Sequence, residues 1–349
     1  MIKVAKFGGS SLSNGEQFAK VKNIIDRDPD RRMVVVSAPG RRSAEDNKVT
    51  DLLYLVKAHI KYDVSYDSIF EIIEQRYMDI RSECHLTLDL DREFEIIRDK
   101  LDKQISMDYL ASRGEFLNAK LMAEYLGYQF VDAADLISFQ YNGEVDMDKT
   151  EENFKEIFEV YNRIVMPGFY GSLPNGEIKV FSRGGSDVSG AIAAASLDAD
   201  VYENWTDVSG ILMVDPHIVD NPKSIARVTY AELRELSYMG AAVLHEDTVF
   251  PVRAKDIPLN IRNTNEPDNP GTIIRESFVA AIPEESHRFI TGITGKRDFS
   301  LIKIAKGNIG DNLNTLRKVI DICEQYDIPI SQIPSGVDSF SIVTPTAKL

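Results

Sequence analysis

Runs of apolar, β-branched residues alternate with amphipathic stretches along most of the chain, and this alternation limits the fold more than any other feature. It is typical of β-α units stacked around a mostly parallel sheet. The sequence therefore predicts an α/β fold, an open αβα sandwich with ligands bound in the loops at the strand ends. Expected strands are residues 2–7, 33–37, 129–132, 163–166, 179–181, 201–205 and 259–261, and expected helices are residues 17–26, 51–58, 112–126, 149–161, 187–197 and 230–239.

Two segments depart from this alternation. Residues 65–103 carry apolar residues at helical spacing, many charges and no strand signal, which predicts an inserted helical hairpin packed on one edge. A turn-rich break at residues 265–271 leads into a polar connector that ends near His287. We expect a domain boundary there, between a large domain of residues 1–280 and a small unit of residues 288–349.

The small unit is expected to contain a strand at 300–305, a helix at 313–326 and two strands at 330–333 and 340–343. This β-α-β-β order is most of a ferredoxin-like unit, but no second helix follows. Either the unit is truncated or a partner subunit completes its sheet. Because an unpaired strand edge favours association, we expect a dimer.

Composition excludes several classes of function. No run of about 20 apolar residues could span a bilayer, and the first residues lack the apolar region of a signal peptide, so we expect a cytoplasmic protein. The formal charge of -15, without a basic stripe, argues against nucleic acid or membrane partners. Cys84 and Cys323 have no His or Cys at metal-ligand spacing, so we expect neither a disulfide nor a protein-held metal.

The first loop that could bind a ligand or take part in catalysis is residues 6–11 (Lys-Phe-Gly-Gly-Ser-Ser), after an expected strand and before an expected helix. Gly8 and Gly9 allow backbone N–H groups to face a phosphate, Ser10 adds a hydroxyl donor, and Lys6 supplies a charge. The spacing matches neither the Walker pattern nor the dinucleotide fingerprint. Taken alone, the loop is also consistent with an ordinary turn after a strand.

A second loop, residues 181–187 (Phe-Ser-Arg-Gly-Gly-Ser-Asp), again follows an expected strand and opens a helix. Arg183 offers a planar fork suited to a carboxylate, and Gly184 and Gly185 permit close approach. Ser186 and Asp187 would also serve as plain helix caps. Two Gly-Gly-Ser loops at equivalent strand ends are nevertheless hard to attribute to turns alone.

Two further segments are weaker signals. In residues 205–211 (Trp-Thr-Asp-Val-Ser-Gly-Ile), Thr206 and Asp207 could hold nucleotide hydroxyls, and an apolar pocket near Leu212 could take adenine; an ordinary turn explains them equally well. In residues 112–115 (Ser-Arg-Gly-Glu), expected at a helix start, Glu115 could accept from an ammonium group or simply complement the helix N-terminus.

Taken together, these segments resemble the aspartokinases of the amino acid kinase superfamily, over nearly the whole chain. The resemblance implies an amino acid kinase fold followed by small-molecule-sensing ACT domains, and formation of 4-phospho-L-aspartate from ATP and L-aspartate, the first step toward lysine, threonine and methionine. The motifs that carry it are residues 6–11, 37–40 (Ser-Ala-Pro-Gly), 48–51 (Lys-Val-Thr-Asp), 112–115, 183–187 and 206–211.

The resemblance also implies residue roles. Lys6 would neutralise charge on the transferring phosphoryl group, and Asp187 would orient Lys6 and the substrate. Arg183 would hold the α-carboxylate of aspartate and Glu115 its amino group. Further substrate contacts are expected from Ser37, Thr50, Gly184, Gly185 and Ser186, and further nucleotide contacts from Gly8, Gly9, Ser10, Thr206, Asp207, Leu212 and His217. Mg²⁺ is expected to bridge the phosphates rather than sit in a protein cage.

The chain departs from the family pattern at a few positions. Ala242 stands where many aspartokinases have a Lys near the nucleotide, Glu246 replaces a frequent Pro, and His217 stands where an Arg is usual. We therefore expect an active enzyme with altered ATP contacts. His245 is expected to be a half-buried structural histidine.

Two alternatives stay open. One is a kinase with another acceptor, namely glutamate, acetylglutamate or a nucleoside monophosphate. The other is a catalytically weak amino-acid sensor with lysine or threonine as ligand. For the kinase, an amino-acid effector such as lysine is expected, and the incomplete small unit predicts weak or absent feedback inhibition by lysine.

Overall fold

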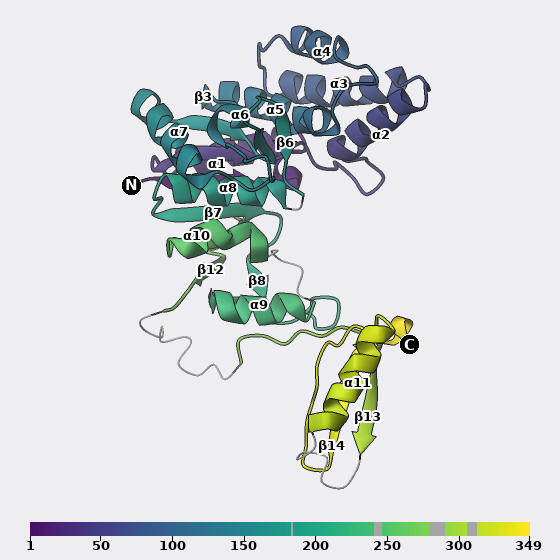
Figure 1. Cartoon of the computed structure of the whole chain (residues 1–349). Helices are drawn as coiled ribbons and strands as arrows, with labels where there is room; N and C mark the ends of the chain where they lie inside the picture. The colour runs from purple at the N-terminus through teal and green to yellow at the C-terminus, as the bar shows by residue number, and fades with distance from the viewer. Residues whose placement is uncertain (183, 241–245, 279–289, 306–312) are drawn as a thin grey trace. The chain divides into compact units, whose positions relative to one another are not determined.

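The computed structural model describes residues 1–182, 184–240, 246–278, 290–305 and 313–349 (Figure 1). The chain divides into two compact units. The larger unit contains Met1–Tyr238 and Ala242–Ile293, and the smaller contains Met239–Ala241 and Thr294–Leu349. No helix in the described ranges is long and apolar enough to cross a bilayer.

An eight-stranded sheet forms the centre of the larger unit, with the strand order β10-β12-β11-β7-β1-β2-β4-β3. All neighbouring pairs are parallel except β11 and β12, which are antiparallel. The predicted α/β fold with a mostly parallel sheet is therefore confirmed. The strands are β1 (Lys3–Phe7), β2 (Arg31–Val36), β3 (Gln129–Phe130), β4 (Ile164–Pro167), β7 (Val201–Thr206), β10 (Arg227–Thr229), β11 (Leu259–Asn263) and β12 (Thr272–Arg275).

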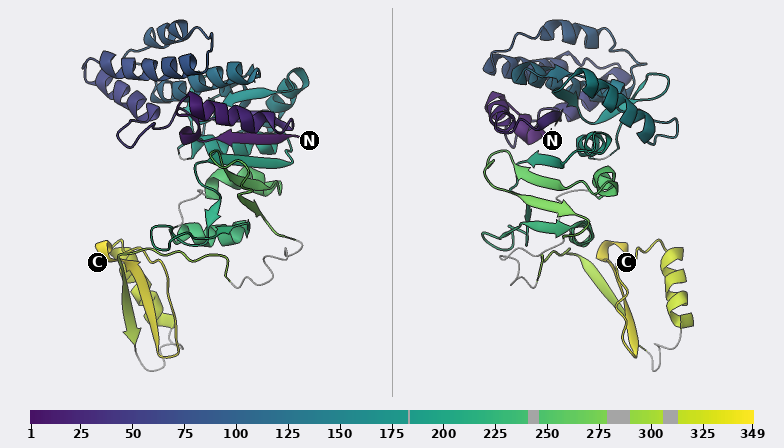
Figure 2. Two further views of the ribbon diagram at one scale, coloured as in Figure 1. Left: turned by 180° about the vertical axis from the view of Figure 1, so that it is seen from behind. Right: turned by 90° about the vertical axis from the view of Figure 1, so that its left-hand side faces the viewer.

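Helices cover both faces of the sheet (Figures 1 and 2). The expected helices are present, and the predicted inserted hairpin is confirmed as α3 and α4. The helices of the larger unit are α1 (Gly15–Asp26), α2 (Val49–Lys61), α3 (Asp67–Glu83), α4 (Leu90–Arg98), α5 (Met107–Leu126), α6 (Ala133–Leu136), α7 (Met147–Val160), α8 (Gly185–Ser196), α9 (Tyr230–Tyr238) and α10 (Phe250–Ala254).

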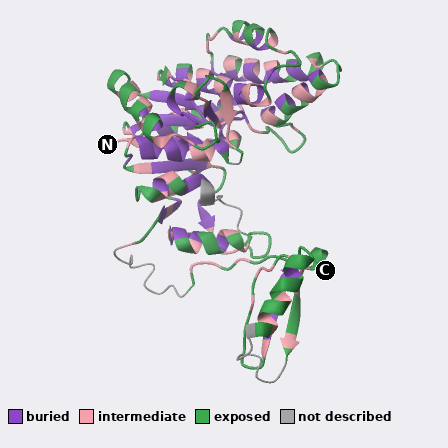
Figure 3. Ribbon diagram, in the orientation of Figure 1, coloured by how far each residue is buried: buried purple, intermediate pink, exposed green. Residues whose placement is uncertain are grey.

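Side chains alternate between the two faces of the central strands, and both faces are buried (Figure 3). Ala5 and Phe7 of β1 belong to one large apolar cluster with α1, α2 and α5. The intervening residues, Val4 and Lys6, therefore point to the opposite face. α8 packs against β1, β2 and β7. Its small residues allow a close approach, as a Cβ on Gly190 would lie 2.5 Å from the Tyr202 hydroxyl.

The strand expected at residues 179–181 does not belong to this sheet. Here the chain forms a separate antiparallel hairpin of β5 (Tyr170–Ser172) and β6 (Ile178–Val180). The residues between the two strands, Leu-Pro-Asn-Gly-Glu, carry the turn signals that favour a hairpin over a crossover. The two Gly-Gly-Ser loops therefore do not follow equivalent strands: the first follows β1 of the main sheet, and the second follows β6 of the hairpin and opens α8. A second small hairpin pairs β8 (Ile211–Leu212) with β9 (Ser224–Ile225).

A cluster of charged residues is buried within the sheet beside Trp205. Two nitrogens of Arg31 donate to the carboxylate of Glu203 at 2.6 and 3.0 Å, and the indole Nε1 of Trp205 donates to the same carboxylate at 2.9 Å. Arg262 lies 3.6 Å from it on the other side. The cluster joins β2, β7 and β11, so it fixes the strand that carries Asn204.

Replacing Glu203 with Gln should lower the free energy of unfolding by about 2 kcal/mol, because Arg31 would stay buried with its charge uncompensated. Urea unfolding followed by tryptophan fluorescence measures this, since the chain has 1 Trp and it lies in the cluster. Glu16→Gln, on an exposed i,i+4 pair, is the control. Equal stability of the two variants would contradict this account.

The smaller unit pairs β13 (Phe299–Ala305) with β14 (Ser339–Pro345) in antiparallel fashion, with α11 (Leu313–Gln325) between them in sequence. Cys323, Phe340 and Ile342 form its buried core. The strand expected at 330–333 is reduced to isolated bridges from residues 332 and 335 to β14. Pro334 lacks the N–H that a continuous ladder would need. β14 thus lies between β13 and this segment, as in a split β-α-β unit.

Candidate active site

The loops after β1, β2, β4 and β7 meet at one edge of the sheet because these strands are parallel. Backbone hydrogen bonds join them beyond the strand ends. The amide of Gly8 donates to the carbonyl of Trp205 at 3.0 Å, and that of Ser37 donates to the carbonyl of Phe7 at 3.2 Å. The amide of Gly168 donates to the last residue of β2 at 2.9 Å. This edge is therefore held as one connected surface.

Lys6 lies at the end of β1 and is 7% exposed. It is paired in register with Asn204 of β7, and both side chains face α8. The Lys6 Nζ lies 2.6 Å from the Asp187 Oδ1 and 3.4 Å from the Asn204 Oδ1. The Asn204 Nδ2 donates to the same Asp187 oxygen at 3.0 Å. We call these three residues the lysine cluster.

Asp187 reaches Lys6 because α8 begins at the sheet edge. Gly184 precedes this helix with φ of 54°, a left-handed conformation that favours glycine. A Cβ on Gly185 would lie 2.4 Å from the Phe169 ring, so packing also requires this glycine. Ser186 lies against the loop after β4 and is half-buried. Arg183, the predicted carboxylate-binding residue, lies outside the described residues.

Gly9 lets the first loop touch the loop after β2, backbone to backbone. The amide of Gly40 donates to the carbonyl of Gly9 at 2.8 Å, and a Cβ on Gly9 would lie 2.9 Å from the Ala38 carbonyl oxygen. A Cβ on Gly8 would instead meet the Lys6 Nζ at 3.6 Å, an ordinary contact. Ser10 is exposed in the 3-10 turn Gly9–Leu12. Close packing therefore requires glycine at position 9. At position 8 a side chain would fit sterically, and glycine leaves space beside the Lys6 ammonium group.

Sequence reasoning missed Arg76, which comes from the inserted helix α3 and is 1% exposed. Its Nη1 donates to the carbonyl of Gly40 at 2.8 Å, and its Nη2 lies 2.6 Å from both carboxylate oxygens of Asp46. The inserted hairpin thus holds the loop that touches Gly9. An Arg amid the apolar positions of a predicted helix was the available signal.

Glu115 lies in the third turn of α5, because this helix begins at Met107 and not at Ser112 as predicted. An effect of the helix N-terminus is therefore small. Glu115 is 5% exposed, and its Oε2 has no hydrogen-bond partner within the described part of the chain. Burial raises the pKa of this carboxyl to about 8, against a smaller opposing effect of a hydrogen bond from the Ala38 backbone. The free oxygen suits an ammonium group.

Ser37 and Thr50 are both half-buried near this position. The carbonyl of Ser37 accepts a hydrogen bond from the Asn118 side chain of α5 at 2.7 Å, which ties the loop after β2 to the helix of Glu115. Thr50 lies in the first turn of α2. Val49, the preceding residue, packs beside Gly114 of α5, so α2 begins close to the same helix.

Residues predicted on the nucleotide side follow β7. The Thr206 hydroxyl donates to the exposed Asp207 carboxylate at 3.2 Å. The backbone carbonyl of Thr206 accepts a hydrogen bond from the Thr264 amide at 2.9 Å. The Thr264 hydroxyl in turn lies 2.8 Å from that of Ser11, which connects this region to the first loop. Sequence reasoning missed Thr264 as well.

Two other residues predicted on the nucleotide side, Leu212 and His217, follow further along the chain. Leu212 is half-buried in β8, and His217 is exposed with its amide donating to the Asp215 carboxylate at 2.8 Å. Ala242 and His245 lie outside the described residues. In the ranges that the structure describes, no group of three or more His, Cys, Asp or Glu side chains could hold a metal ion.

The family model described as "Amino acid kinase family" matches residues 1–263. Aspartokinase 3 of Bacillus subtilis (strain 168) is 36% identical over 98% of this chain and 77% of its own length. The chain belongs to the amino acid kinase family. Within that family it is one of the aspartokinases, whose bifunctional members are longer. It spans 42% of the bifunctional aspartokinase/homoserine dehydrogenase of Buchnera aphidicola, to which it is 27% identical.

Solved aspartokinase structures are similar over the whole chain. The crystal structure of Clostridium acetobutylicum aspartate kinase is 48% identical, with a TM-score of 0.90, and the match covers 100% of this chain and 79% of that one. E. coli aspartokinase III in complex with aspartate and ADP is 24% identical, with a TM-score of 0.73, and covers the same shares of the two chains. At that identity it shows a common fold.

Proposed function

We propose that this aspartokinase-family chain transfers the γ-phosphoryl group of ATP to the β-carboxylate of L-aspartate, yielding ADP and 4-phospho-L-aspartate. The observation that carries the proposal is the lysine cluster. It places a buried ammonium group between a glycine-containing strand-end loop and the start of α8. Similarity to aspartate kinases over the full chain supports the choice of acceptor.

The transferring phosphoryl group carries spread negative charge, so catalysis depends on positioning and on charge neutralisation. Lys6 neutralises that charge, and Asp187 holds the Lys6 ammonium in place at 2.6 Å. The nucleophile is a carboxylate that is already ionised, so no general base is needed.

Substrate binding is assigned to the residues near α5. Glu115 receives the amino group of aspartate, for which its buried, unpartnered oxygen is suited. Arg183 pairs with the α-carboxylate, and Ser37, Thr50 and Ser186 line the β-carboxylate side. Gly184 and Gly185 contribute by fixing the start of α8.

The terminal phosphates are assigned to Gly8, Gly9 and Ser10, and the rest of the nucleotide to Thr206, Asp207, Leu212 and His217. Mg²⁺ supplies additional charge neutralisation when it accompanies the nucleotide. The donor set described above offers no protein cage, so oxygen ligands from the phosphates would predominate.

Incubation with ATP, Mg²⁺, L-aspartate and hydroxylamine tests the proposal, because hydroxylamine traps an acyl phosphate as a hydroxamate. We expect aspartate-dependent hydroxamate and no product without Mg²⁺. The same reaction with L-glutamate in place of aspartate is the matched control. Signal with glutamate and none with aspartate would reject the proposed acceptor.

Asn204 is proposed as a positioning residue for the Lys6–Asp187 pair. Asn204→Leu should lower kcat by about tenfold with little change in either KM, because the Asp187 carboxylate loses one of its two donors. Steady-state kinetics with both substrates measures this. Asn204→Asp adds a carboxylate that repels Asp187, so it should lower kcat further than Asn204→Leu does. A rise in KM without loss of kcat would contradict a positioning role.

For the rest of the chain, we propose that residues 1–280 form the catalytic domain and residues 288–349 an ACT-like regulatory unit. The split β-α-β arrangement of β13, α11 and β14 supports the second assignment. A homodimer and an amino-acid effector such as lysine are part of this proposal. Size-exclusion chromatography with light scattering, with and without lysine, tests them, and a monomer under both conditions would reject the dimer.

A further inference from the structure

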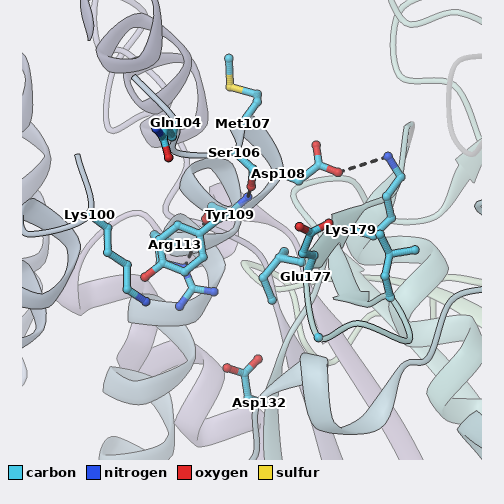
Figure 4. A pocket seen from close by; sticks show the side chains of 13 residues that line it. Lys100, Gln104, Ser106, Met107, Asp108, Tyr109, Arg113, Asp132, Glu177 and Lys179 are labelled. Carbon is cyan, nitrogen blue, oxygen red and sulfur yellow. Dashed lines mark hydrogen bonds and ion pairs between the residues drawn. The ribbon is translucent and has the colours of Figure 1, made fainter. Parts of the chain in front are cut away.

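A cavity is lined by the first turns of α5 and by the turn of the β5–β6 hairpin, and none of the three residues of the lysine cluster lines it (Figure 4). Its volume is about 660 Å³, within the range of small-molecule sites. None of its lining residues is assigned above to aspartate or ATP. Arg113 lines it, and since residues two apart on a helix point about 200° apart, Arg113 and Glu115 face different sides of α5.

Arg113 is the most informative residue of the cavity. It is 6% exposed, yet no carboxylate lies within ion-pair distance of it among the residues that the structure describes, and Glu115 interacts with it only at longer range. Its Nε and Nη2 bond only to neutral oxygens of its own helix, the Tyr109 carbonyl and the Ser112 hydroxyl. Stacking on Tyr109 and Phe116, at 4.5 and 4.2 Å, stabilises the charge in part. A buried cation without a direct ion pair favours an anionic ligand group.

Lys100 adds a second cation to the lining of the cavity. Its Nζ lies 4.6 Å from the centre of the Tyr109 ring, the ring on which Arg113 also stacks. Figure 4 shows the side chains of Lys100, Arg113 and Asp132 among those that line the cavity. Lys100 and Arg113 are thus the cations available to a ligand carboxylate, whereas Lys179, which also lines the cavity, already pairs with Asp108 at 3.2 Å.

Asp132 supplies the opposite charge. Its Oδ1 accepts from the Tyr170 hydroxyl at 2.7 Å and from the Ala134 amide at 3.0 Å, which fixes the carboxylate, while its Oδ2 has no hydrogen bond to the described residues. A fixed carboxylate opposite two cations is complementary to a zwitterion. The side chains of Met107, Leu173 and Ile178 also line the cavity and provide apolar surface.

We propose that this cavity binds a small α-amino acid with an apolar side chain, its carboxylate on Arg113 and Lys100 and its ammonium on Asp132. The site is separate from that of the phosphoryl acceptor. The bound amino acid would contact the β5–β6 hairpin, and only residues 181–184 separate β6 from the start of α8 in the sequence. Binding in the cavity is therefore close in sequence to the segment that carries Arg183 and Asp187.

Isothermal titration calorimetry of the full chain with L-leucine tests the proposal, in the presence of saturating L-aspartate and ADP. We expect saturable binding. 3-Methylbutylamine, which lacks the carboxylate, and 4-methylpentanoate, which lacks the amine, should each bind at least about tenfold more weakly. Equal binding by either analogue, or no saturable heat with L-leucine, would overturn the proposal. So would loss of L-leucine binding when aspartate is added, because the ligand would then occupy the acceptor site.

Matched variants locate the site. Asp132→Asn keeps both hydrogen bonds of the Oδ1 and removes the charge, so it should fold normally and weaken L-leucine binding by about tenfold. Lys100→Ala, at an exposed position, should weaken it about threefold, and Lys155→Ala on α7 should change nothing. Unchanged L-leucine affinity in both cavity variants would reject this site. These measurements do not depend on turnover, so they stand even if the proposed kinase activity fails its own test.

Discussion

Replacing Lys6 with Met is expected to lower kcat by about 10³-fold while leaving the fold intact, because a single preorganised charge at a transferring group contributes on that order. The methionine side chain fills similar volume, so the packing between β1 and α8 persists. KM for aspartate and for ATP should change only a few-fold, because the Lys6 charge acts mainly on the transition state. Initial rates of hydroxamate formation and a circular dichroism spectrum check both parts.

Lys155→Met, on the exposed surface of α7, is the control for the loss of one positive charge. It should retain full activity. A Lys6→Met enzyme with more than a tenth of the parent kcat would show that Lys6 is a structural partner of Asp187 and that phosphoryl transfer relies on other groups.

The affinity for aspartate should rise steeply with pH between 6 and 8. The pKa of Glu115, raised to about 8 by burial, means that the free protein carries a proton on this carboxyl below that pH. An ammonium ligand pairs with the ionised form, so the dissociation constant for aspartate should fall about 50-fold from pH 6 to pH 8. Calorimetric titration with L-aspartate at several pH values measures this.

Glu115→Gln removes the titrating group and should give a dissociation constant that is nearly independent of pH and about 100-fold weaker than the parent at pH 8. Glu95→Gln, exposed on α4, should behave as the parent protein does. A flat pH profile in the parent would show that Glu115 does not receive the ammonium group.

The same shift affects folding in the opposite direction. The folded-state pKa of this acid is above its unfolded value of 4.5, so its contribution to stability is full below pH 4.5 and is lost as pH rises toward 8. As pH rises from 6 to 8, ionisation of Glu115 therefore increases the affinity for aspartate and decreases the free energy of unfolding. The opposite signs allow the two effects to be told apart experimentally.

The pattern of short apolar, β-branched runs was enough to predict strands such as β1 and β2, because these strands are buried on both faces of the sheet. It failed for the β5–β6 hairpin, whose short apolar runs look like those of a sheet strand. It also failed at residues 330–333, where an apolar run lacks continuous pairing. The start of α5 was also misplaced: the helix begins at Met107, where Ser106 caps it by accepting a hydrogen bond from the Tyr109 amide, and this cap was not recognised in the sequence.

For the site, glycine-rich loops identified the neighbourhood of Lys6 and Asp187. They could not show that Asn204 joins the pair, because that requires the register of β1 against β7. Glu115 was identified with two interpretations, and only its place in the third turn of α5 removes one of them. Arg76 and Thr264 depend on contacts between segments more than 30 residues apart, which no local pattern encodes.

The bond from Arg76 to Gly40 gives the inserted helices a part in shaping the strand-end loops. A chimaera that exchanged residues 65–103 for the shorter connection of another kinase would keep every strand of the sheet. It would nevertheless lose the support of the Gly40 loop, and with it the contact that positions Gly9. Deleting an insertion of this kind is therefore expected to disturb the active-site loops, whereas substitutions within it offer a way to alter those loops without changing a residue of the site itself.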